Sequence, residues 1–143
     1  VQMSISLLYQ YWIHTELINK MPKWFEYIFN TPSHHRVHHA TNPQYLDRNF
    51  AGIFIIWDKF FRSFEPEIEK PVYGLITNIE TYNPIKVAFI EWISMIKDFT
   101  SSKTSIINKF KYFIKPPGWN HKGTSVLSKD LRKEWEENKK ANT

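Results

Sequence analysis

Four of the six histidines in this chain lie within six consecutive positions of the segment TPSHHRVHHATN, residues 31–42. If the segment is helical, His35, His38 and His39 stand at i, i+3 and i+4, so their imidazoles leave one face of the helix and reach a common centre. Imidazole nitrogen binds iron, zinc and copper, and the chain has no cysteine that would favour a softer metal. The spacing therefore predicts a metal site.

The flanking residues predict that this helix is short and sharply bounded. Thr31 suits the N-cap and Pro32 the first helical position, while Asn42 followed by Pro43 is a stop signal. Arg36 stands where the H-E-x-x-H helix of metalloproteases has its glutamate base, so hydrolysis by that route is disfavoured. A surface tract that binds metal only adventitiously is the alternative interpretation.

Two histidines lie outside this segment. His14 follows an apolar, aromatic stretch within residues 1–19, which predicts the end of a membrane or membrane-edge helix. Gln10, four residues earlier, shares its face. A polar pair at a membrane edge is costly unless it has a function, so His14 is a further candidate metal ligand. His121, between polar neighbours, is expected to be an ordinary exposed histidine.

The composition favours a membrane surface. Aromatic residues make up 17% of the 143 residues, and aromatic side chains such as Trp and Tyr gather where an apolar phase meets water. The net charge of +5 fits an anionic lipid face or a nucleic acid, but the lysines are scattered, which argues against nucleic acid. The absence of cysteine excludes a disulfide framework and favours a reducing, cytosol-facing site.

The remaining segments predict helices and loops. Residues 21–30 are expected to form an aromatic connector, residues 50–64 a buried or interfacial helix, and residues 84–99 and 105–114 two amphipathic helices. Residues 72–77 could form a short strand. Beyond residue 119 the composition becomes charged, which predicts a solvated, partly disordered tail over residues 120–143 with at most a marginal helix near 131–138. We expect one domain over residues 1–119.

Several motifs together resemble one family. Gln10-x-x-x-His14, the histidine segment PSHHRVHH, Asn42 and a glycine-containing apolar run that ends in Trp57-Asp58 resemble the fatty acid hydroxylase/sterol desaturase superfamily of membrane di-iron oxygenases. The similarity runs from about residue 9 to residue 119. It is more specific than the histidine spacing alone.

The resemblance implies an all-α, membrane-embedded enzyme fragment with interfacial amphipathic helices, located in the endoplasmic reticulum membrane with its site facing the cytosol. It implies that His14, His35, His38 and His39 are iron ligands, while His34 falls off the H-x-x-H-H pattern and is expected either to support a ligand from outside the metal or to be structural. Gln10 stands where many relatives have histidine and is expected to be a hydrogen-bonding partner or a weak ligand. The family's other histidine motifs do not occur here, so we expect a carboxy-terminal part of a longer protein.

The implied reaction is oxygen-dependent hydroxylation of a lipid C–H bond. Within the superfamily, the motifs are most similar to the branch that cleaves the ether bond of alkylglycerols to an aldehyde and glycerol, with tetrahydrobiopterin as electron donor. A sterol oxidase or fatty-acid hydroxylase, which draws electrons from cytochrome b5, is the nearest alternative. A non-catalytic zinc-binding module at a membrane or nucleic-acid surface, and a catalytically dead paralogue, also remain open.

Overall fold

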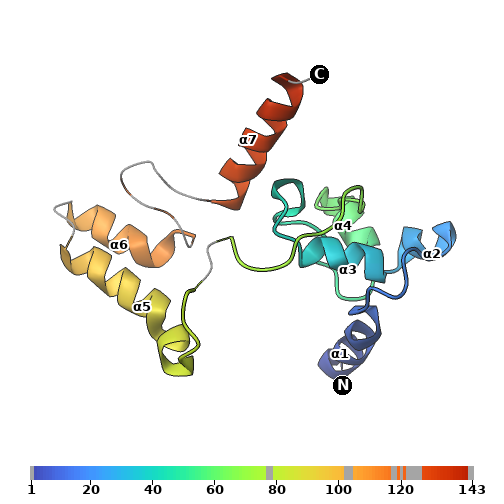
Figure 1. The fold of residues 1–143 in the computed structure, drawn as a ribbon, viewed down its shortest axis with the longest axis horizontal. Helices are drawn as coiled ribbons and strands as arrows, with labels where there is room; N and C mark the ends of the chain where they lie inside the picture. The colour runs from blue at the N-terminus through green and yellow to red at the C-terminus, as the bar shows by residue number, and fades with distance from the viewer. Residues whose placement is uncertain are drawn as a thin grey trace. The chain divides into compact units, whose positions relative to one another are not determined.

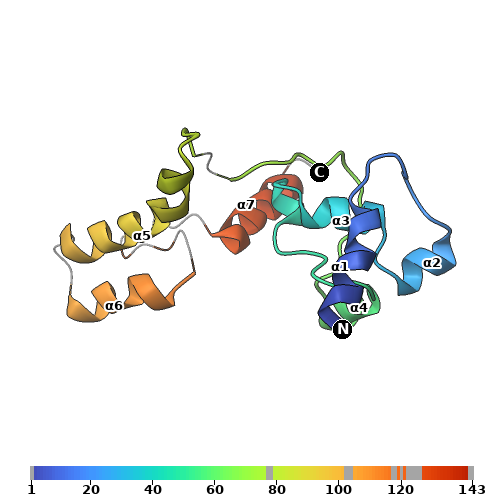
Figure 2. The same cartoon turned by 90° about the horizontal axis from the view of Figure 1, so that it is seen from below.

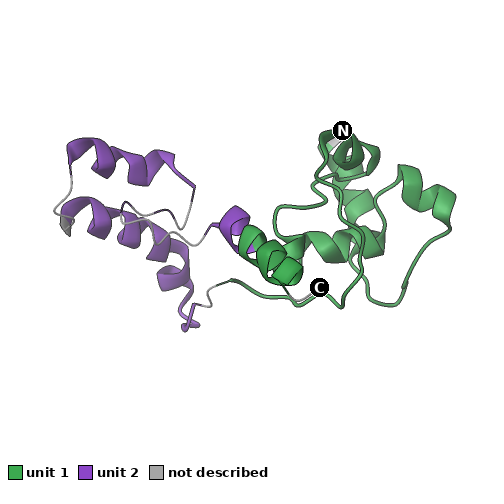
Figure 3. Cartoon of the chain, turned by 90° about the horizontal axis from the view of Figure 1, so that it is seen from above, with its two compact units in different colours: residues 1–76, 132–143 green, residues 77–131 purple. Residues whose placement is uncertain are grey.

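The computed structural model describes residues 2–76, 79–101, 105–116, 119, 121 and 127–141. The chain forms two compact units, Val1–Ile76 with Arg132–Thr143, and Thr77–Leu131 (Figure 3). The described residues are mostly helical and contain no strand beyond one isolated bridge between Ala40 and Tyr73, which confirms the all-α prediction. Among these residues, no helix is both long enough and apolar enough to cross a membrane.

The first unit is built around the histidine helix (Figure 1). Its helices are α1 (Gln2–Ile13), α2 (Lys23–Ile28), α3 (Pro32–His38), a 3-10 turn (Pro43–Tyr45) and α4 (Ile56–Phe61). The α3 helix begins as predicted, with Thr31 at the N-cap and Pro32 in its first turn, but it ends at His38 and is capped by His39, before the Asn42-Pro43 stop. The α1 helix lies against α3 in both views (Figure 2).

Residues 50–64 are helical only over α4, so the prediction of a helix along this whole segment is wrong. The backbone of its first part is hydrogen-bonded elsewhere: the amides of Phe50 and Ala51 donate to the Asp58 carboxylate, at 2.9 and 2.8 Å. The side chain of the buried residue Asn30 donates to the Ala51 carbonyl at 2.6 Å, and the backbone amide of Asn30 donates to the Ile53 carbonyl at 2.7 Å. A helix over the whole segment would instead pair the Ala51 and Ile53 carbonyls with its own amides.

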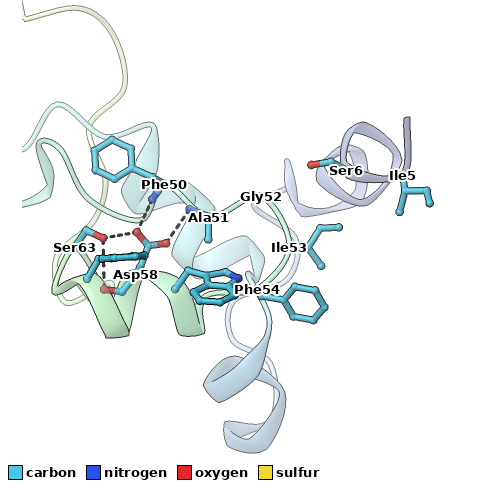
Figure 4. A pocket seen from close by; sticks show the side chains of 11 residues that line it. Ile5, Ser6, Phe50, Ala51, Gly52, Ile53, Phe54, Asp58 and Ser63 are labelled. Carbon is cyan, nitrogen blue, oxygen red and sulfur yellow. Dashed lines mark hydrogen bonds between the residues drawn. The ribbon is translucent and has the colours of Figure 1, made fainter. Parts of the chain in front are cut away.

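Asp58 holds this loop in place, and its removal gives a first prediction. The 3% exposed carboxylate accepts the two loop amides and, at 2.6 Å, the Ser63 hydroxyl (Figure 4). The change Asp58→Ala is expected to lower the free energy of unfolding by about 2–3 kcal/mol, because donors at a buried site lose a charged acceptor. Urea denaturation measures this. Glu137→Ala, on an exposed helix surface, should change the same quantity by less than about 0.5 kcal/mol, and an equal loss in both variants would contradict the prediction.

The interior around α3 combines a small apolar cluster with buried polar groups. Val37, Ala40 and Tyr45 form the apolar cluster. Asn49, 1% exposed and in the left-handed region with φ 53°, donates to the carbonyls of His34 and Glu65, at 3.1 and 2.8 Å. Hydrogen bonds from side chains to backbone therefore fix the chain around α3, and they leave little freedom for the histidines it carries.

The second unit contains the two predicted amphipathic helices, α5 (Pro84–Ser101) and α6 (Ile106–Ile114), which lie side by side. The Ser105 hydroxyl caps α6 by accepting from the Asn108 amide at 3.4 Å. Pro117 and Gly118, expected to follow the end of α6, are outside the described residues. His121 was expected to be freely exposed, but it is half-buried and its Nδ1 is hydrogen-bonded to the Tyr112 hydroxyl at 2.6 Å, so this prediction is wrong.

The carboxy-terminal segment forms helix α7 (Ser128–Ala141), which is longer than the marginal helix predicted near 131–138. Its sequence, SKDLRKEWEENKKA, is rich in Leu, Arg, Lys and Glu, which favour helix, and it has an acid in the first turn and lysines in the last. Arg132 donates to the Leu46 carbonyl at 2.9 Å. The predicted strand over residues 72–77 is reduced to the Tyr73 bridge, and Thr77 lies outside the described residues.

Candidate metal centre

Three of the four predicted ligands converge. The Nε2 atom of His35 lies 2.8 Å from that of His14 and 3.0 Å from that of His39, and His14 and His39 are 3.2 Å apart through the same atoms. His14 stands just after α1, His35 lies on α3, and His39 is the C-cap residue of α3. The ring centroids of His14 and His35 are 4.1 Å apart, so the ligand that follows α1 and the ligand on α3 lie close together.

The orientation of His14 is fixed by its own helix. Its Nδ1 lies 2.6 Å from the Gln10 carbonyl, and because a carbonyl can only accept, Nδ1 carries the proton and donates it. With the proton on Nδ1, the Nε2 atom keeps its lone pair, which is the ligand electron pair, and lies toward the other two histidines. Gln10 thus acts through its backbone, while its side chain donates to the Ser6 hydroxyl at 3.0 Å instead of entering the site.

These separations can be tested against a metal ion. At a metal–nitrogen distance of about 2.1 Å, nitrogen ligands on one face of an octahedron lie about 3.0 Å apart, and ligands of a tetrahedral ion about 3.4 Å apart. The three observed distances, 2.8, 3.0 and 3.2 Å, match the octahedral face. Hydrogen bonds among the three nitrogens cannot satisfy all three pairs. Each pair needs one donor and one acceptor, and a ring nitrogen that carries a proton cannot also accept. The set therefore fits a six-coordinate cation with three nitrogen ligands from this chain.

Electrostatics keeps His35 and His39 neutral. Burial, together with the nearby His14, His39 and His38, which oppose an added positive charge, lowers the pKa of His35 to about 3. Burial, followed by His38 and His14, also lowers the pKa of His39. Because only the neutral imidazole coordinates a metal, His35 and His39 are ready to bind near pH 7 without first losing a proton.

His38 lies beside this group but does not join it. Its exposed ring is nearly parallel to that of His35, with centroids 5.6 Å apart, and its Nδ1 donates to the Arg48 carbonyl at 3.3 Å. A donating Nδ1 leaves Nε2 as the available ligand atom, as in His14. The prediction that His38 binds metal therefore stays a prediction.

His34, the remaining histidine of the segment, packs into the interior. It is 4% exposed, and its ring stands edge-on to Phe64 with centroids 5.2 Å apart. Its Nδ1 has no hydrogen-bond partner within the described part of the chain. Burial lowers its pKa, so it is neutral at pH 7. The geometry supports the structural role expected from its place outside the ligand pattern.

Sequence reasoning missed the importance of Arg36. Its guanidinium forms a bidentate ion pair with the Glu67 carboxylate, through Nε at 2.9 Å and Nη2 at 2.6 Å. It also donates to the carbonyls of Thr15, Ile18 and Asn19, at 3.2, 2.8 and 2.7 Å. Arg36 thereby ties the loop that follows His14 to the helix that carries His35. No local pattern indicates this, because Glu67 is 31 residues away.

Two cavities in the first unit lie next to histidines. One, of about 440 Å³, has His14, His35 and His39 in its wall, together with Ile13, Thr15, Glu16, Arg36, Tyr73 and Gly74. The other, of about 980 Å³, is mainly apolar, and Ile5 and Ser6 of α1 face its other lining residues, 50–54, 57, 58, 61 and 63 (Figure 4). Phe50 links the second cavity to the site, because its ring lies edge-on to that of His38 at 6.0 Å.

The chain is similar to known proteins. Residues 1–63 match the fatty acid hydroxylase family. The chain is 50% identical over 119 residues to alkylglycerol monooxygenase of Homo sapiens, 46% to that of Xenopus tropicalis, and 43% over 129 residues to that of Caenorhabditis elegans. Each match covers 83% of this chain and 25–26% of the relative, so the chain spans about a quarter of the relatives' length. No solved structure matches it significantly.

Proposed function

We propose that this chain, which belongs over residues 1–63 to the fatty acid hydroxylase family, carries part of the iron centre of a membrane monooxygenase. The full-length enzyme would use dioxygen to hydroxylate a C–H bond of a lipid. The observation that carries the proposal is the convergence of three Nε2 atoms, from His14, His35 and His39, at separations of 2.8–3.2 Å. The relatives, named as alkylglycerol monooxygenases, support an oxidoreductase.

The histidines fit a di-iron centre. His14, His35 and His39 would hold one ion, and His38, whose Nδ1 is engaged by the Arg48 carbonyl, would offer Nε2 to a second. Iron accepts imidazole ligands and six-coordinate geometry, and when bound it would activate dioxygen for insertion into an unactivated C–H bond. These four residues supply too few ligands for two such ions, so further ligands would come from the rest of the full-length protein.

The residues of this chain would bind the lipid and exclude water. Trp57, Phe54 and Phe61 line the large apolar cavity, whose volume of about 980 Å³ is ample for an alkyl chain. Phe50 lies between this cavity and His38, so a chain bound there would approach the ligand histidines from an apolar side. An apolar approach limits water that would compete with the substrate for the oxidant.

The substrate we favour is an alkylglycerol, by analogy with the relatives' names. Hydroxylation of the CH₂ group next to the ether oxygen consumes one oxygen molecule, two electrons and two protons, and gives a hemiacetal and water. The hemiacetal then breaks its C–O bond, which leaves an aldehyde and glycerol. We propose tetrahydrobiopterin as the two-electron donor. A sterol oxidase or fatty-acid hydroxylase is the alternative within the superfamily, and it would depend on cytochrome b5.

We further propose that the full-length enzyme resides in the endoplasmic reticulum membrane with the histidine site facing the cytosol. The partners are then the lipid substrate and the membrane itself, and not a nucleic acid. The high aromatic content, 17% of residues, supports an interfacial setting. Amphipathic helices in the second unit support it as well.

The test is metal analysis and product formation by the full-length protein in detergent, with an alkylglycerol and tetrahydrobiopterin, with and without oxygen. The variant is His38→Ala and the matched control is His121→Ala, a histidine outside the site. We expect about two irons per chain, with aldehyde release that requires oxygen, persists in the control and is lost in His38→Ala.

Other results would contradict this assignment. If the full-length protein carries only zinc, or if the His38→Ala variant keeps the full activity, the ligand assignment is wrong and the zinc-binding module is favoured. Activity that follows cytochrome b5 and a sterol or fatty acid, in place of pterin and an ether lipid, would keep the iron centre but change the substrate class.

A further inference from the structure

The α5–α6 hairpin of the second unit exposes far more apolar surface than it buries. On α5, five large residues stand on one face and are each at least 55% exposed: Ile85, Phe89, Trp92, Ile93 and Ile96. On α6, five more are at least 47% exposed: Ile106, Ile107, Phe110, Phe113 and Ile114. Contiguous apolar surface of this kind marks an interaction site.

The two exposed faces join into one surface. Phe99 of α5 packs edge-on against Phe110 and Phe113 of α6, with ring centroids 6.2 and 5.6 Å apart. By helical periodicity, Phe99 is next to Trp92 on the edge of the α5 face, and the two α6 aromatic residues belong to the α6 face. The hairpin thus uses a few aromatic contacts to align its helices and leaves the rest of each apolar face outward.

Charge is distributed around this surface in a definite order. At 100° per residue, Lys86 and Lys97 flank the α5 face, while Glu91 and Asp98 lie on the opposite side of the helix. On α6, Lys109 and Lys111 flank the apolar face on its two sides, and the helix has no acidic residue. Lysines at the edge of an apolar face keep their charge in the headgroup layer while their stems contact acyl chains.

We propose that the α5–α6 hairpin is a monotopic attachment surface that inserts its apolar face into an anionic lipid membrane. The flanking lysines select a negatively charged surface, and the absence of acid from α6 removes repulsion there. Trp92 is of the side-chain type that settles at the boundary between headgroups and acyl chains. The helices are too short or too charged to cross the membrane, so the hairpin would lie in its plane.

This surface is in a different unit from the histidine site, so the two proposals can fail separately. Membrane attachment of a lipid-consuming enzyme would place it where its substrate is dissolved. Vesicle binding by a metal-free chain would therefore support this inference even if no monooxygenase activity were found.

The test is flotation of the 143-residue chain with phosphatidylcholine vesicles, with and without phosphatidylserine. Ile96→Glu puts a charge at the centre of the apolar face, and Ser94→Glu puts the same charge two positions away, on the opposite side of the helix. We expect binding to phosphatidylserine vesicles to fall about tenfold or more in Ile96→Glu and by much less in Ser94→Glu. The double change Lys86→Gln and Lys111→Gln should weaken binding about fivefold per lysine, only where phosphatidylserine is present.

A second measurement does not depend on a charged substitution. Brominated phosphatidylcholine quenches tryptophans that reach the acyl chains, and Trp92→Phe should remove most of this quenching, whereas Trp135→Phe on α7 should not. Helicity by circular dichroism must match the parent chain in every variant. Failure of the parent chain to float, equal binding by Ile96→Glu, or self-association through this face without vesicle binding would overturn the proposal.

Discussion

Replacing His35 with alanine is expected to weaken metal binding by the chain roughly a hundredfold or more, because residues that merely orient ligands already contribute about 10–100-fold. His35 is the central ligand: its Nε2 is the atom shared by the two shortest separations, 2.8 and 3.0 Å. It is also the most buried of the three, at 6% exposure. Anaerobic calorimetric titration with Fe²⁺ measures the effect, and His121→Ala is the control.

Cobalt gives a second measurement on the same variant. Co²⁺ absorbs weakly in visible light when six-coordinate and strongly when tetrahedral, so the spectrum reports the geometry inferred from the nitrogen separations. We expect the weak, six-coordinate spectrum in the parent chain; because aqueous Co²⁺ is also six-coordinate, loss of binding in His35→Ala is read from the calorimetric titration. A strong tetrahedral spectrum would contradict the octahedral face, and unchanged affinity in the variant would show that the metal binds elsewhere.

Removal of the Arg36 side chain gives the second large expected effect. Arg36→Met should lower the free energy of unfolding of the first unit by about 3–5 kcal/mol, because breaking a buried pair leaves a carboxylate without its cation. The side chains of Arg36 and Glu67 are only 10% and 13% exposed. Three carbonyls of the loop after His14 would lose their donor as well. Urea denaturation followed by circular dichroism measures the change, and Fe²⁺ affinity should fall with it because His14 loses its anchor.

A paired variant separates the two contributions of Arg36. If the ion pair dominates, changing Glu67 to Met together with Arg36→Met should restore most of the stability, since no charge is left buried. We expect partial recovery, because the double variant leaves no buried charge, whereas the carbonyls of Thr15, Ile18 and Asn19 still lack their donor. Lys133→Met, which breaks an exposed pair with Glu137, should cost less than about 0.5 kcal/mol. Stability of Arg36→Met equal to that of Lys133→Met would show that the buried network is not holding the loop.

The sequence was sufficient wherever one local pattern dominates. The i, i+3, i+4 spacing of His35, His38 and His39, with Thr31 and Pro32 before it, predicted where the ligand helix begins. The apolar periodicity of residues 84–99 and 105–114 predicted α5 and α6. In each case neighbours within one or two helical turns decide the structure, so a short window contains the information. The same applies to α7, whose helix-forming composition favours a helix longer than the one predicted near 131–138.

Local periodicity failed where distant groups compete for the backbone. Residues 50–64 look helical from their apolar spacing, yet Asn30 and Asp58 take the hydrogen-bonding groups of residues 50, 51 and 53, and the helix begins only at Ile56. His121 looked exposed because its sequence neighbours are polar, while Tyr112 from the preceding helix holds it. A partner that arrives through folding cannot be inferred from the segment it binds.

By itself the sequence predicted the kind of chemistry, because three histidines at ligand spacing in an aromatic, cysteine-free chain indicate a nitrogen-bound metal near a lipid phase. Only the tertiary structure decided which nitrogens meet. His14 reaches His35 and His39 across 21 and 25 residues, and the Arg36–Glu67 pair closes a span of 31. Such contacts arise when α1, α3 and the segment around Glu67 pack together. Helical spacing places side chains on a face, but only packing brings two faces to within 3 Å of each other.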